Sequence, residues 1–198
     1  LTSAVAAVRG VPHDAAFQSI SGFFYCLIPL TLFLMAWLLT RAPGYSFAAA
    51  MVYSLAAPTQ LLAPDERFAL ARVWDARRLY IAAAWDETPH LAALALLPLV
   101  VLFLVLAFRK GRLVYCAAAA VAVALAALAS AFGPVMVAMA VLCLLFVLGR
   151  ERLGRNLALT AAIGAFGYAL AAPFLSPSIL RAMRASAPAG GSGWTMGS

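Results

Sequence analysis

The chain has 198 residues, of which 66% are hydrophobic and only 11% are charged, and its mean hydropathy is +0.98. Soluble domains are nearer half apolar and a quarter charged, so the composition excludes an ordinary soluble domain and indicates a polytopic membrane protein. The formal charge of +7 does not indicate nucleic-acid binding, because the basic residues form short clusters between apolar runs and no basic stripe or motif.

Apolar runs predict an all-α fold with about six transmembrane helices. The predicted spans are residues 20–40, 45–62, 91–108, 113–131, 135–148 and 156–172. We expect residues 9–19 to be a short segment of mixed polarity, and Gly133-Pro134 to form a tight turn. The whole of 1–198 is predicted to be one helical membrane domain, a piece of a larger protein, with a flexible tail at 175–198.

A row of small residues lies in the fourth predicted span. Ala118, Ala122, Ala126 and Ser130 are four residues apart, which puts them on one helix face. Small side chains let helix backbones approach closely in a membrane, so this face is predicted to pack against another helix.

The basic residues predict an orientation. If every span crosses once, Arg41 and the clusters at 109–112 and 149–155 fall on the same side. The loop at 64–90 has no basic excess and falls on the other side. We therefore predict a multi-pass protein of a bacterial inner (plasma) membrane, with the basic loops cytoplasmic and residues 64–90 periplasmic.

The polar loop at 64–90 is predicted to be an interfacial amphipathic helix. Leu70, Trp74, Ile81 and Trp85 share one face at helical spacing, and the segment is too polar to cross a bilayer. Arg77 and Arg78 lie in this segment. Their guanidinium groups could hold a phosphate in a bidentate manner, or they could simply reach up to lipid headgroups.

Asp86, Glu87 and His90 stand immediately before the third span. A carboxylate near a half-buried imidazole is typical equipment for general acid or base catalysis, and the carboxylates could instead bind a divalent cation. The competing interpretation is that Asp86 and Glu87 stabilise the positive end of the next helix while Thr88 caps it. No cysteine and histidine cluster with metal-ligand spacing is present.

His13 and Asp14 are predicted to fall on the same side of the membrane as Glu87 and His90. The two acid and histidine pairs could meet in one cavity, although a solvated loop end is the simpler interpretation.

Several runs resemble the multi-pass bacterial proteins of the GT-C glycosyltransferase superfamily. They are FFYCLIPLTLF at 23–33, YSFAAA at 45–50, YSLAAP at 53–58, RRL at 77–79, WDETPH at 85–90 and SAFG at 130–133. The resemblance covers about residues 12–148.

This resemblance implies transfer of a sugar from a polyprenyl-phosphate donor on the non-cytoplasmic face. It implies a catalytic acid in an early external loop, for which Asp14 is the candidate, and donor-binding residues in a later one, where Glu87 and His90 fall. With membrane lipids and a lipid-linked donor as partners, Arg77, Arg78 and Asp86 would bind substrate. The alternative is a non-enzymatic lipid or polysaccharide flippase or export component, but the spans carry few of the polar residues that would line a path.

Overall fold

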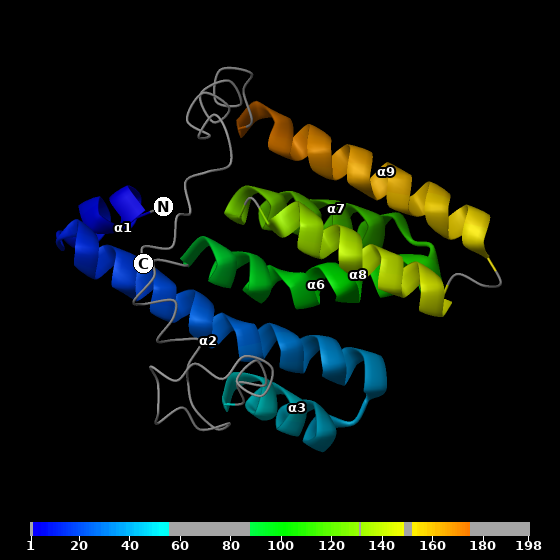
Figure 1. Ribbon diagram of the computed structural model, residues 1–198, viewed down its shortest axis with the longest axis horizontal. Helices are drawn as coiled ribbons and strands as arrows, with labels where there is room; N and C mark the ends of the chain where they lie inside the picture. Colours follow the sequence, from blue (N-terminus) through cyan, green and yellow to red (C-terminus); the bar gives the residue numbers. More distant parts are fainter. Residues whose placement is uncertain (1, 56–87, 131, 149–151, 175–198) are drawn as a thin grey trace, which may run out of the picture.

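The computed structural model describes residues 2–55, 88–130, 132–148 and 152–174, and the fold in these ranges is all-helical (Figure 1). This confirms the predicted fold class. The elements are α1 Thr2–Arg9, α2 His13–Thr40, α3 Pro43–Leu55, α6 Thr88–Lys110, α7 Leu113–Ala129, α8 Gly133–Leu148, α9 Leu153–Ala171 and the 3-10 turn η2 Ala172–Phe174.

The first long helix, α2, begins earlier than the apolar pattern predicts. The expectation of a separate mixed segment at residues 9–19 is wrong, because α2 starts at His13 directly after Pro12. Asp14 lies in its first turn, where a carboxylate is stabilised by the positive end of the helix. The helix continues through Pro29 and ends at Thr40. The next residue, Arg41, adopts a left-handed conformation (φ 60°) and donates its backbone N–H to the Trp37 carbonyl at 2.8 Å.

The central element is α6, which packs against α2 on one side and against α7, α8 and α9 on the other (Figure 1). Its sequence is apolar all round, as expected for a helix surrounded by other helices. Val100, Leu102 and Leu104 are its most deeply buried large side chains, each at most 1% exposed. By contrast α2 and α9 lie at the outside of the bundle and keep most of their apolar surface uncovered.

The alanine-rich α7 fills the narrow space between α6 and α9. Of the predicted row of small residues, Ala122, Ala126 and Ser130 are buried and Ala118 is half-buried. On α9, Gly167 is also buried, and a Cβ atom there would lie only 3.2 Å from the carbonyl oxygen of Ala120, a residue that is not in that row and lies on another face of α7. Gly167 and Ala120 therefore allow a close approach of α7 and α9.

The turn between α7 and α8 falls slightly earlier than predicted. Gly133 and Pro134 open α8 instead of forming the turn, which suits proline because the first turn of a helix needs no donor from it. The Gly133 N–H donates to the Ser130 carbonyl at 2.9 Å. A Cβ atom at Gly133 would lie 2.0 Å from the carbonyl oxygen of Ala126, so only glycine fits this close approach.

Three described helical segments are long and apolar enough to cross a membrane: His13–Thr40, Thr88–Lys110 and Leu153–Phe174. The helices α7 and α8 are apolar but have only 17 and 16 residues, and α3 has 13. Phenylalanine, leucine and tryptophan side chains are exposed along the outer faces of the bundle. Exposed apolar surface on this scale belongs against lipid, so the chain is a helical membrane protein.

Candidate active site at the histidine end

Alternating helix directions give the bundle two chemically different ends. The ends of α2, α6 and α8 and the starts of α3, α7 and α9 lie together, on the right of Figure 1. We call this the basic end, and its described charged residues are Arg41, Arg109, Lys110, Arg112, Arg152 and Arg155. We call the opposite end the histidine end, because α2 and α6 begin there. His13 is the first residue of α2, and His90 lies in the first turn of α6.

The described charges differ sharply between these ends. No carboxylate lies among the described residues of the basic end. At the histidine end the described charged residues are Arg9 and Asp14, whose opposite charges sum to zero. The described basic residues that the sequence pattern assigns to one side of the membrane therefore lie at one end of the bundle. The candidate site residues Asp14 and His90 fall at the end without basic excess.

Four of the six predicted site residues, Arg77, Arg78, Asp86 and Glu87, lie outside the described residues, as does nearly all of the predicted amphipathic helix at 64–90. Their proposed roles remain predictions, and so does the divalent-cation alternative that depends on the two carboxylates. Among the described residues no group of three histidine, cysteine or acidic side chains is placed to hold a metal ion.

The first residue of α6 makes a buried contact with α2. The Thr88 and Ser21 side chains are 7% and 6% exposed, and their hydroxyl oxygens are hydrogen-bonded to each other. Ser21 also donates its single hydroxyl proton to the Phe17 carbonyl at 3.0 Å. Thr88 must therefore be the donor to Ser21, and this bond fixes the start of α6 against α2.

His90 faces a different part of the bundle from Thr88. Two residues along a helix rotate a side chain by about 200°, so His90 points away from α2. Its ring lies 5.1 Å from the ring of Phe132, in the turn between α7 and α8, with the two planes tilted by 37°. Its Nδ1 atom is buried, although the residue as a whole is only half-buried, and that atom has no hydrogen-bond partner among the described residues.

A buried ring nitrogen without a partner is costly, by about 1–3 kcal/mol, and such atoms are uncommon in folded proteins. At a functional site the missing partner is commonly a bound ligand or water. The imidazole therefore has one nitrogen free to accept or donate a hydrogen bond to a molecule at the histidine end.

Asp14 and His90 are not brought together. Asp14 lies seven residues before Ser21 on α2, so it occupies nearly the same helix face about 10 Å further toward the histidine end. That face is directed at Thr88, on the other side of α6 from the His90 ring. His13 and Asp14 are both exposed, and Glu87, the acid of the other pair, lies outside the described residues, so the meeting of the two acid and histidine pairs stays a prediction.

Ser21 and Phe132 are contacts that the sequence did not identify. A serine and a phenylalanine in largely apolar surroundings carry no separate signal, and their partners lie 67 and 42 positions away in the chain. The one available hint was the position of Ser21 in an otherwise apolar span, where a hydroxyl needs an acceptor.

No protein-family model, no curated protein and no solved structure matches the chain.

Proposed function

We propose that this chain is part of an integral-membrane transferase that moves a sugar from a polyprenyl-phosphate donor at the non-cytoplasmic membrane surface. The observation that carries the proposal is the buried Nδ1 atom of His90, which has no partner among the described residues and lies at the end of the bundle where the described charges show no basic excess. The sequence places Glu87 three residues before this histidine. The resemblance to GT-C glycosyltransferases supplies the reaction class.

The orientation follows from charge. Six described basic residues at one end favour the cytoplasm for that end, by the positive-inside rule. The histidine end then faces the periplasm of a bacterial inner membrane, and the chain crosses six times if α3, α7 and α8 also span. A donor held in the outer leaflet would present its phosphate at the level of His90.

Each candidate residue has a role in this proposal. Glu87 removes the proton of the acceptor hydroxyl, and His90 orients or assists it through its free ring nitrogen. Arg77 and Arg78 hold the donor phosphate, since guanidinium groups match phosphate oxygens in pairs. Asp14 is the second candidate base, and its position across α6 from His90 favours Glu87.

A flippase or export component is the alternative function. Such a protein needs polar or charged side chains along a path through its helices. In the described ranges the charged residues stand only at helix ends. The buried hydroxyls of Thr31 and Ser46 bond to carbonyls of their own helix or turn, Ile28 and Ala42. The position of the described charged residues at helix ends therefore favours the transferase.

The experiment is a transfer assay with the chain in its full-length protein, reconstituted in liposomes with radiolabelled polyprenyl-phosphate sugars. Glu87→Gln removes the base and leaves size and polarity unchanged, so label transfer should fall at least a hundredfold. His90→Gln should also reduce transfer. His13→Gln is the matched control, because His13 is exposed and lies at the same end of the bundle.

Transfer that survives Glu87→Gln but is lost in Asp14→Asn would move the base to Asp14. Transfer equal to wild type in each of the variants Glu87→Gln, Asp14→Asn and His90→Gln would refute the proposed site. Rapid lipid scrambling by a protein that transfers no sugar would support the flippase instead.

A further inference from the structure

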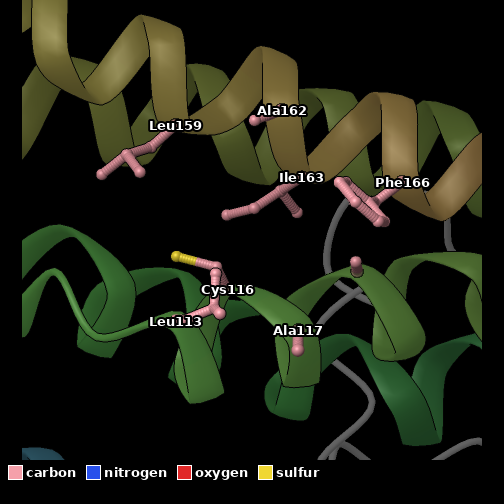
Figure 2. Close-up of a pocket in the computed structure, with 8 residues that line it drawn as sticks. Leu113, Cys116, Ala117, Leu159, Ala162, Ile163 and Phe166 are labelled. Carbon is pink, nitrogen blue, oxygen red and sulfur yellow. The ribbon is translucent and has the colours of Figure 1, made fainter.

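An apolar groove runs between α7 and α9, near the basic end and away from His90. Its volume is about 310 Å³ and its lining is almost entirely carbon. In Figure 2 the side chains of Leu159 and Ile163 point from α9 toward α7, and the Cys116 sulfur points from α7 toward α9. Ala117 and Ala162 line the groove and are exposed, so it opens on the outer surface of the bundle.

The groove begins where positive charge is concentrated. The helices α7 and α9 run parallel, and both start at the basic end (Figure 1). The residue before each is an arginine, Arg112 before α7 and Arg152 before α9, and neither helix start has a side-chain cap. Uncapped N–H groups and the helix dipole favour an anion at both positions.

Four basic residues of α6, α7 and α9 at this end divide into two groups. Arg155 donates a hydrogen bond to the Phe108 carbonyl, and Lys110 lies 5.3 Å from the Tyr115 ring centre. These two are thereby engaged with the ends of α6 and α7. Arg112 and Arg152 are exposed and lie among described residues that include no carboxylate at this end.

We propose that this groove binds one acyl chain of an anionic glycerophospholipid, with its phosphate on Arg112 and Arg152. Leu113, the first groove residue, directly follows Arg112, so a chain entering there leaves its headgroup beside the arginine. The lining of α7 extends from Leu113 to Ala120, which is about 10 Å of helix. A basic mouth on an apolar groove between membrane helices matches an anionic headgroup on an acyl chain.

This lipid site is independent of the proposed transferase. It lies at the other end of the bundle from His90, and its lipid belongs to the opposite leaflet from the sugar donor. Loss of sugar transfer would not affect it, and loss of lipid binding would not affect the assignment of Glu87.

The experiment uses native mass spectrometry of the full chain in mild detergent, titrated with phosphatidylglycerol or with phosphatidylcholine of the same acyl chains. Phosphatidylglycerol should bind at least tenfold more tightly. The double variant Arg112→Gln with Arg152→Gln should weaken phosphatidylglycerol about thirtyfold, since each arginine near an anionic lipid contributes about a fivefold factor, and should weaken phosphatidylcholine far less, because the choline ammonium offsets the charge of its phosphate. Ala162→Phe fills the groove from an exposed position and should weaken both lipids.

Arg41→Gln is the matched control. Arg41 is exposed at the same end but follows α2, away from the groove, so this variant should change phosphatidylglycerol binding less than threefold. A loss with Arg41→Gln equal to that of the double variant would indicate general charge attraction and overturn the site. Unchanged binding in Ala162→Phe, or equal affinity for the two lipids in wild type, would overturn it as well.

Discussion

Two glycines on α9 should respond in opposite ways to the same substitution. A Cβ atom at Gly167 would lie 3.1 Å from a methyl carbon of Val123 and 3.2 Å from the Ala120 carbonyl oxygen. Gly164 lies three residues earlier on the same helix, and a Cβ atom there would meet nothing within 4 Å. The pair therefore separates helix propensity from packing.

The magnitudes follow from these distances. Alanine favours a helix interior over glycine by about 1 kcal/mol, and this gain applies to both positions. At Gly167 the added methyl group must push α7 and α9 apart, and overfilling of a packed contact costs about 1–3 kcal/mol. Gly164→Ala should therefore raise the free energy of unfolding by about 1 kcal/mol, whereas Gly167→Ala should leave it unchanged or lower it by up to about 2 kcal/mol.

The assay is unfolding in mixed micelles by titration with sodium dodecyl sulfate, followed by far-ultraviolet circular dichroism. Wild type, Gly164→Ala and Gly167→Ala are compared in the same host detergent. Gly167→Ala should unfold at a lower detergent fraction than Gly164→Ala. If the two variants gain equal stability, α7 and α9 do not approach as closely as described.

Three further substitutions test the histidine end and the turn beside it. Ser21→Ala should lower the free energy of unfolding by about 1–3 kcal/mol, because it leaves the Thr88 hydroxyl buried without its partner. Thr88→Val should lower it less, because Ser21 keeps its bond to a backbone carbonyl. A double-mutant cycle that finds no coupling between the two positions would contradict the bond between Ser21 and Thr88. Gly133→Ala should destabilise by about 2 kcal/mol or more, since its methyl group would overlap the Ala126 carbonyl, and stability equal to wild type by the same titration would argue against the close turn.

Hydrophobic runs predicted the long apolar helices because a helix that crosses a bilayer must be both long and apolar. The bilayer requires about 20 residues with satisfied backbone groups, and α6 meets this at Thr88–Lys110. Helix ends were less predictable. His13–Ser19 joined α2 although the segment is not apolar, because Pro12 and Asp14 favour a helix start locally.

The site was only partly predictable. The position of His90 at a helix start was evident from the sequence, but its contact with Phe132 depends on how α7 and α8 return to α6. A direct contact of Asp14 with His90, the less simple of the two interpretations of the sequence, is disfavoured for a geometric reason. Residues that share one side of a membrane can still lie on opposite sides of a central helix.

The central place of α6 constrains how the protein assembles during synthesis. The chain completes α2 long before α6, so the α2 face that will be covered must first meet lipid. Its two buried hydroxyls tolerate this, because Ser21 and Thr31 already bond to carbonyls of their own helix, those of Phe17 and Ile28. Arrival of α6 then adds Thr88 to a hydroxyl that was never without a partner, so both buried hydroxyls of α2 have acceptors within their own helix before α6 is made.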